Sequence, residues 1–236
     1  MKQNKSKLTI AILTILHSAI STANQDAIIL LNTEREYLPN TFINNKKEWL
    51  GLYCQENSCQ LKKINAIVKN SKSQSEGVLG LEDIQLIKFN NSPLAAFQNI
   101  NNLYEGFVTT SYINTNNTSI PFNKKGYWLL PWKSQSLSIV KRLSTKTQNF
   151  RYYLQSAQQK QWLFDTDFRG HYGDTIAPIV TWVGDLDGDH LVDFIIDLGD
   201  VDCSFGSMLF LSSMTKTNQL IYKAAEFIGT QPACGC

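Results

Sequence analysis

The feature that most limits how this chain folds is its division into short apolar runs separated by Asn, Ser, Gly and Pro. Runs of four to eight residues bounded by such turn formers are typical of β-strands. Phe150, Tyr152 and Leu154 recur at every second position, the period that places side chains on one face of a sheet. Strands are predicted over 48–54, 59–68, 78–89, 94–99, 104–112, 127–131, 136–143, 150–155, 161–165, 177–183, 191–198, 206–212 and 219–228.

Helical patterns are weak throughout the sequence. No segment keeps a helical period over about 12 residues with capping residues at both ends. The sequence therefore predicts a mainly β protein, a single antiparallel β-rich domain with few short helices, one of them near Asn24–Arg35. Internal repeats are absent, so we do not expect a complete propeller, which needs several similar blades.

Residues 1–23 have the three-part layout of a secretory signal peptide. Three lysines precede the apolar run Leu8 to Ile20, and Ser21 and Ala23 occupy the −3 and −1 positions of a cleavage site. The apolar run is shorter than the span of about 20 residues that crosses a bilayer. We therefore expect a periplasmic or secreted protein, with no membrane span after signal cleavage.

The expected mature chain, residues 24–236, is close to neutral. Signal cleavage removes three lysines and no acids, which turns 22 basic and 20 acidic residues into 19 and 20. Lysine pairs such as Lys46-Lys47 and Lys124-Lys125 are scattered along the chain, whereas a nucleic-acid surface needs a clustered basic patch. Nucleic acid is therefore not an expected partner. The length suits one sizeable core, so 24–236 is expected to form a single domain.

All five cysteines lie in the expected mature part, where an exported protein meets an oxidising compartment. Cys54 and Cys59 flank a four-residue polar segment between two predicted strands, and opposed hairpin positions have a Cα separation that suits a disulfide. Cys203 is expected to pair with Cys234 or Cys236, which leaves one cysteine over. The spacing of these three cysteines matches no standard zinc pattern.

The stretch VTWVGDLDGDHLVDFIIDLGD, Val180 to Asp200, places several acids beside an apolar segment. Odd-numbered positions of a tightly curled loop converge on one point, and Ca²⁺ binds six to eight oxygens. Two carboxylates about 4 Å apart repel by about 4 kcal/mol at the dielectric of a protein surface. We therefore expect one Ca²⁺ ion in the loop 185–193; the alternative is a polar turn whose acids point into solvent. The expected ligands are Asp185, Asp187, Asp189 and Asp193, with the backbone carbonyl of Leu191.

The spacing of this loop differs from an EF-hand at two positions. The Gly expected at position 6 is His190, and the acid expected at position 12 is Ile196. The flanking segments 180–183 and 191–196 also have the pattern of strands. An EF-hand is therefore excluded, and His190 is expected to be a strained or flexible turn residue and not a ligand, because a positive φ is uncommon outside Gly.

The segment GDLDGDHLVDFIID, Gly184 to Asp197, resembles the calcium loops of FG-GAP and VCBS-type repeats, in which a D-x-D-G-D-G-x-x-D pattern joins two strands. In those families the metal stabilises a blade of a β-propeller. The resemblance implies that the four acids and the Leu191 carbonyl bind calcium, with His190 in place of the second Gly.

Most of the expected mature chain also resembles a group of uncharacterised exported proteins of Gram-negative bacteria. The shared segments are WLGLYC, APIVTWVGDLDGDHLVDFIIDL, LFLSS and AAEF, followed by a C-terminal Cys. This wider likeness implies no particular activity.

Catalytic patterns are lacking in the sequence. His171 and His190 are the histidines left after signal cleavage, and no G-x-S-x-G, H-E-x-x-H or P-loop motif is present. The leading hypothesis is a non-enzymatic, exported, calcium-binding structural or interaction protein whose partner is an envelope protein or a glycan. The alternative is a periplasmic hydrolase acting on envelope glycans, which would need two acids about 5–9.5 Å apart; Glu82 with Asp83 and Asp165 with Asp167 are the candidate pairs, and both fit solvated turns equally well.

Tryptophans offer a further prediction, because such a hydrolase or glycan binder would need exposed aromatic rings. Trp162 and Trp182 lie in apolar runs and are expected in the core. Trp128 and Trp132, in GYWLLPWKS, are the candidates for an exposed aromatic surface.

Overall fold

The computed structural model describes residues 27–31, 35–42, 48–56, 58–72, 83–133, 135–147, 149–166, 177–201 and 204–230. Within these ranges the chain forms β-strands and no helix, so the prediction of a mainly β protein is confirmed. The strands are β1 (Ile28–Leu30), β2 (Glu36–Tyr37), β3 (Trp49–Gln55), β4 (Ser58–Ile64), β5 (Ala66–Lys72), β6 (Asp83–Phe89), β7 (Ala95–Gln98), β8 (Gly106–Ile113), β9 (Tyr127–Leu129), β10 (Ser138–Leu143), β11 (Phe150–Gln155), β12 (Lys160–Thr166), β13 (Ile179–Asp185), β14 (Asp193–Val201), β15 (Ser204–Leu211) and β16 (Tyr222–Thr230).

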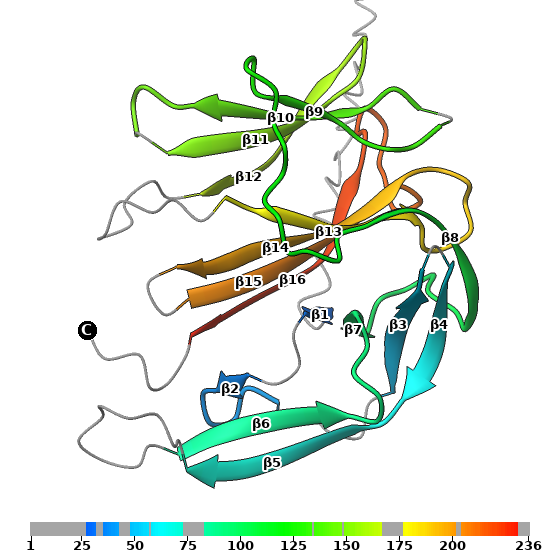
Figure 1. Ribbon diagram of the computed structural model, residues 1–236, viewed down its shortest axis with the longest axis vertical. Coiled ribbons are helices and arrows are strands. Elements are labelled where there is room, and N and C mark those ends of the chain that lie inside the picture. The colour runs from blue at the N-terminus through cyan, green and yellow to red at the C-terminus, as the bar shows by residue number, and fades with distance from the viewer. Residues whose placement is uncertain are drawn as a thin grey trace, which may run out of the picture.

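The largest sheet is antiparallel, with the strand order β1-β7-β3-β4-β8-β13-β14-β15-β16. It curls until β1 packs against β15 and β16 at its other end, as Figure 1 shows. The hydroxyl of Ser207 on β15 donates a hydrogen bond of 2.8 Å to the carbonyl oxygen of Ile29 on β1. The sheet is therefore nearly closed, without forming a complete barrel or a propeller.

The interior of the curled sheet is one of three hydrophobic clusters. Its members include Trp182 on β13, Ile195 on β14 and Leu209 on β15, all fully buried, and Leu52 and Leu61 from the β3–β4 hairpin. Full burial of a large aliphatic side chain stabilises the fold by about 1.5–3 kcal/mol. Strands β13 and β14 are thus held firmly from the inside of the sheet.

A second, four-stranded sheet with the order β12-β11-β10-β9 covers the opposite face of β13, β14 and β15 (Figure 1). The second cluster lies between the two sheets, where Phe194 and Ile196 of β14 meet Ile139 of β10 and Tyr152 of β11. Both faces of β14 are therefore buried. This double burial explains why Phe194, Ile195 and Ile196 are three consecutive apolar residues and do not alternate with polar ones.

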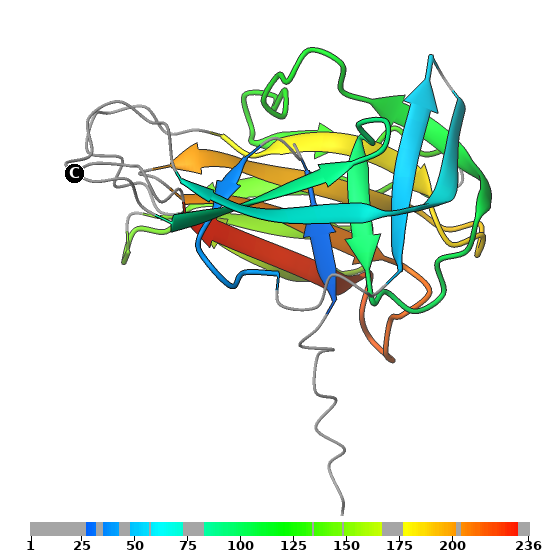
Figure 2. The same cartoon turned by 90° about the horizontal axis from the view of Figure 1, so that it is seen from below.

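The third sheet, with the order β2-β6-β5, lies at the far end of the molecule from the four-stranded sheet, and Figure 2 shows β5 and β6 from below. The third cluster fills the space between this small sheet and the large one. In it the buried ring of Tyr37 meets Phe205 of β15 edge to face, with ring centroids 5.7 Å apart.

The predicted strands match the observed ones closely, except that one predicted run is divided between two strands and the short strands β1 and β2 were not predicted. The single strand expected over 59–68 is two strands that separate at Asn65, because β4 pairs with β3 and β8 whereas β5 pairs with β6 in the small sheet. The prediction of a helix near Asn24–Arg35 is wrong for the described part of this segment, since Ile28–Leu30 form strand β1 beside β7. Pairing with a neighbouring strand here outweighs any local helical tendency.

Cys54 and Cys59 form the predicted disulfide at opposed positions of the β3–β4 hairpin, with a Cα separation of 4.1 Å. The expected signal peptide and Cys203, Cys234 and Cys236 lie outside the described residues. In the part of the chain that the structure describes, no helix is long and apolar enough to cross a membrane.

Candidate metal centre

The acidic loop joins β13 to β14 at one end of the doubly covered layer. Asp185 ends β13 and Asp193 begins β14, and their exposed fractions are only 3% and 0%. The strands that carry these two acids are packed on both faces, so the positions of the carboxylates are set by the core. The loop between them, residues 186–192, curls around them and is held at its two ends by the buried side chains of Leu186 and Val192.

Asp185 organises the first half of the loop. Its carboxylate accepts hydrogen bonds from the backbone N–H of Gly188 at 2.7 Å and from that of His190 at 3.0 Å. Both donors lie in the left-handed region, with φ of 82° at Gly188 and 67° at His190. The expectation that His190 occupies a strained turn position is confirmed. Its side chain is 94% exposed, with Nδ1 at 3.6 Å from Oδ2 of Asp185.

Asp193 links the loop to the next turn of the sheet. Its carboxylate accepts hydrogen bonds from the backbone N–H of Leu186 at 2.7 Å and from that of Ser212 at 2.9 Å. The hydroxyl of Ser212 also donates to it at 3.0 Å. Burial, with a contribution from the nearby charge of Asp187, raises the pKa of Asp193 to about 8. Three donors therefore only partly offset the removal of this acid from water.

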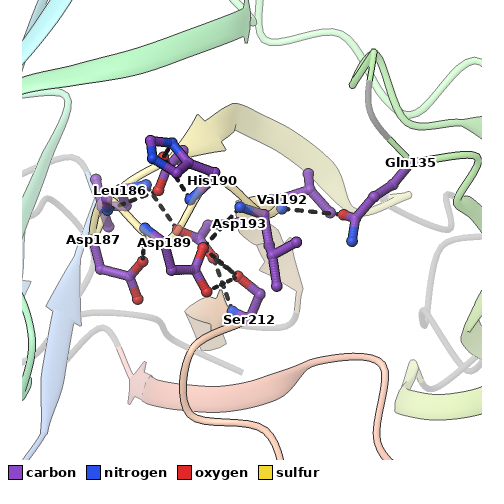
Figure 3. A network of polar contacts seen from close by, with 11 residues as sticks. Gln135, Leu186, Asp187, Asp189, His190, Val192, Asp193 and Ser212 are labelled. Atoms are coloured by element: carbon purple, nitrogen blue, oxygen red, sulfur yellow. Dashed lines mark hydrogen bonds and ion pairs between the residues drawn. The ribbon is translucent and has the colours of Figure 1, made fainter.

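The other two acids of the loop face the turn between β15 and β16 (Figure 3). Asp187 accepts a short hydrogen bond from the hydroxyl of Ser213. Burial raises the pKa of Asp187, and the charges of Asp189 and Asp185 add to this effect. Both carboxylate oxygens of Asp189 lie within hydrogen-bond distance of the hydroxyl of Ser212, at 3.1 and 3.0 Å. Asp189 also accepts a hydrogen bond from the N–H of Leu191 at 2.8 Å.

Three of the acids converge closely enough to share one ion. Asp185, Asp187 and Asp193 each offer a carboxylate oxygen, and these atoms lie within 4.8 Å of one another. Two unit charges at that distance repel by about 3 kcal/mol at an effective dielectric of about 20. Ionised carboxylates held this close together repel one another, so a cation among them would stabilise the arrangement. The arrangement could hold a metal ion, and a hard cation suits an all-oxygen site.

The structure brings three of the five predicted ligands together and leaves Asp189 and Leu191 outside this group. Asp185, Asp187 and Asp193 form the converging triad, whereas Asp189 is joined to Asp193 through the hydroxyl of Ser212. Leu191 has an exposed side chain and uses its N–H to bind Asp189, so its carbonyl remains a predicted ligand.

Serines of the β15–β16 turn take part in the site, although the sequence analysis did not propose them. Ser212 and Ser213 follow β15 directly, and β15 is paired with β14 so that Phe210 lies opposite Phe194. The Ser-Ser pair after an apolar strand was visible in the sequence. Its proximity to the acids depends on strand pairing across about 20 residues, which no local pattern encodes.

Other candidates from the sequence lie elsewhere. His171 and Asp167 are outside the described residues, and Asp165 accepts from the indole N–H of Trp162 at 2.7 Å. Trp182 is buried as predicted, but Trp162 is 55% exposed, so its assignment to the core is wrong. It lies opposite Tyr153 on the face of the four-stranded sheet that points away from the second cluster.

The expected exposed aromatic surface at Trp128 and Trp132 is also wrong. Both side chains are half-buried and pack against the second cluster. Trp128 lies beside Ile139 in the register of β9 and β10, on the inward face of the four-stranded sheet.

Comparison with known protein families, with curated proteins and with solved structures finds no match for this chain.

Proposed function

We propose that this chain is an exported calcium-binding structural or interaction protein, in which one Ca²⁺ ion joins the β13–β14 loop to the β15–β16 turn. The observation that carries the proposal is the convergence of Asp185, Asp187 and Asp193. Two oxygens bound to one Ca²⁺ at about 2.4 Å are at most about 4.8 Å apart. The separations in the triad lie within this limit.

The loop topology supports a calcium site of the FG-GAP or VCBS type. The acidic loop links two neighbouring antiparallel strands, as those calcium loops do, and it curls through left-handed residues at Gly188 and His190. The three-part N-terminal pattern and the Cys54–Cys59 disulfide support export, since disulfides persist in oxidising compartments.

A structural role fits the site better than hydrolysis. Each acid of the triad accepts hydrogen bonds from neighbouring loop or turn groups, and Asp193 is fully buried. Two hollows, of about 660 and 630 Å³, are lined by described residues of other segments and not of the acidic loop. An ion held by these acids would fix the loop and, through the hydrogen bonds of the acids with Ser212 and Ser213, would also stabilise the β15–β16 turn.

Calorimetric titration of the purified mature protein with Ca²⁺ and with Mg²⁺ tests the proposal. We expect one bound Ca²⁺ per chain, a higher melting temperature in Ca²⁺ than in EDTA, and a smaller effect of Mg²⁺. Asp187→Ala should abolish the stabilisation by Ca²⁺. Asp83→Ala is the matched control, because Asp83 forms an exposed ion pair with Lys72 at 2.6 Å, away from the loop. No heat of binding and no change in melting temperature at millimolar Ca²⁺ would refute calcium binding.

A further inference from the structure

A hollow of about 660 Å³ lies on the face of β3, β4 and β8 that points away from the core. Cys59 and Leu61 of β4 are buried, so the alternate residues Gln60 and Lys62 face outward. Tyr53 on β3 and Phe107 on β8 are the register partners of Gln60. One aromatic, one amide and a second aromatic side chain therefore form a row across three strands.

Phe107 is unusual among the apolar side chains of the described chain because it is 84% exposed. An exposed ring at the rim of a polar hollow contributes nothing to the core. It offers a flat apolar surface of the kind on which a ligand ring can stack. Tyr53, at the other end of the row, is half-buried, and its hydroxyl donates to the backbone carbonyl of Asn90 at 3.0 Å.

Amide side chains dominate the polar lining. Gln55, Gln60, Asn65 and Asn91 line the hollow, and in the part of the chain that the structure describes their side chains form no hydrogen bond with other residues. Each amide offers two donors and an acceptor. A set of neutral groups with both functions is complementary to a ligand rich in hydroxyl groups, which also donate and accept.

The charge of the lining has one sign. Lys62 and Lys63 are present, and no Asp or Glu is among the described residues that line the hollow. Lys63 is paired with Glu48 at 3.2 Å, whereas Lys62 lies over the ring of Tyr53 with Nζ at 5.6 Å from its centroid. Lys62 therefore places a positive charge beside an aromatic ring in the lining of the hollow. This charge favours an anionic group on the ligand.

The frame of the hollow is fixed before any ligand binds. The Cys54–Cys59 disulfide closes the hairpin at one end, and the bond from Tyr53 to Asn90 ties it to the segment after β6. Gly51 lies beneath the side chains of Tyr53 and Ile64, whose nearest atoms would be 2.9 Å from any Cβ at that position. A site that is already ordered loses little conformational entropy on binding.

We infer that this hollow binds a saccharide that carries carboxylate groups. Phe107 stacks on a sugar ring, the amides of Gln60 and its neighbours bind the hydroxyls, and Lys62 pairs with a sugar carboxylate. The inference names the partner class for the interaction role proposed above. It uses none of the residues of the acidic loop, so it stands or falls separately from calcium binding.

The test is a calorimetric titration of the mature protein in EDTA with oligomers of galacturonate, mannuronate and hyaluronate. EDTA keeps calcium, which uronate oligomers also bind, out of the measurement. The methyl ester of the galacturonate oligomer is the matched neutral ligand. We expect at least one of these acidic oligomers to bind with a Kd below about 1 mM. If the galacturonate oligomer binds, it should bind more tightly than its methyl ester.

Variants assign the binding to the hollow. Phe107→Ala should weaken binding about fivefold or more, whereas Phe107→Tyr, which keeps an aromatic ring, should retain it. Lys62→Gln should selectively weaken the acidic oligomers. Trp162→Ala is the control, since Trp162 is an exposed aromatic residue on a different sheet. Absence of binding to every oligomer, unchanged affinity in Phe107→Ala, or loss of binding in Trp162→Ala alone would overturn the inference. Failure of calcium binding with saccharide binding intact would refute only the proposed function.

Discussion

In the absence of a cation, the free energy of unfolding should fall as the pH rises from about 4 to about 8. Asp193 is fully buried, and burial raises its pKa from 3.8 to about 8. Between these two values the folded chain keeps a proton that the unfolded chain has released. Stability from this group is therefore fully present below pH about 4 and is lost as the pH approaches 8.

The size of the effect follows from the width of this pH window. One group contributes about 1.4 kcal/mol for each pH unit between its two pKa values, so Asp193 can remove about 5 kcal/mol across the window. Burial also raises the pKa of Asp187, which acts in the same direction. Exposed ion pairs such as Lys72–Asp83 contribute at most about 1 kcal/mol each. The fall should therefore dominate.

The variant Asp193→Asn isolates this group. An amide retains one oxygen for the N–H of Ser212, but its NH₂ faces the N–H of Leu186, and an unpaired buried donor costs about 1–3 kcal/mol. At pH 8 without a cation, this cost is smaller than the stability that the wild type loses through the raised pKa of Asp193. Asp193→Asn should therefore be less stable than the wild type at pH 4 and more stable at pH 8. Saturating Ca²⁺ should reverse the order at pH 8, because the wild type keeps a charged ligand.

Urea denaturation followed by circular dichroism, in EDTA at pH values from 4 to 8, measures these differences. Asp83→Asn is the control and should run parallel to the wild type, since its carboxylate is exposed. A flat or rising stability of the wild type over this range would refute the reasoning. The same slope in Asp193→Asn as in the wild type would show that another group is responsible.

Two further substitutions test the packing around the acidic loop, and one double substitution tests the disulfide of the β3–β4 hairpin. Ser212→Ala should cost about 1–3 kcal/mol in EDTA, because it removes the hydroxyl shared by the two acids Asp189 and Asp193; chemical denaturation beside Ser58→Ala checks this. Gly184→Ala should cost about 3 kcal/mol or more, since a Cβ would lie 2.2 Å from the carbonyl oxygen of Thr109 and 2.3 Å from the ring of Trp182; a melting curve no lower than that of the wild type would contradict it. Replacing both cysteines of the β3–β4 hairpin by Ser should cost about 2 kcal/mol, as expected for a short closed loop, and a reducing agent should lower the wild-type melting temperature in parallel.

Strands could be predicted from this sequence because most of them are bounded by turn formers and keep one apolar face. The prediction failed where pairing, and not local pattern, decides the structure. The run 59–68 has no turn former strong enough to indicate the change of sheet at Asn65. β1 and β2 contain three and two residues, which is too short for a period of two to be detected.

Side-chain exposure was harder to predict than strand position. Trp162 lies in an apolar run, yet its partner Tyr153 and a bulge at Leu163 place it on the outer face of the four-stranded sheet. Trp128 faces inward because its register with Ile139 points it at the second cluster. A one-residue change of register moves a side chain to the other face, and register depends on the partner strand.

The acidic loop shows why the acids stand beside a buried strand. Asp185 and Asp193 take their positions from β13 and β14, which are packed from both sides, and the carboxylate of Asp193 reaches the turn after β15 through Ser212. A charge there is costly in the absence of a cation and stabilising in its presence. The same burial that raises the pKa of Asp193 to about 8 would therefore make the junction of three strands responsive to a cation bound in the loop.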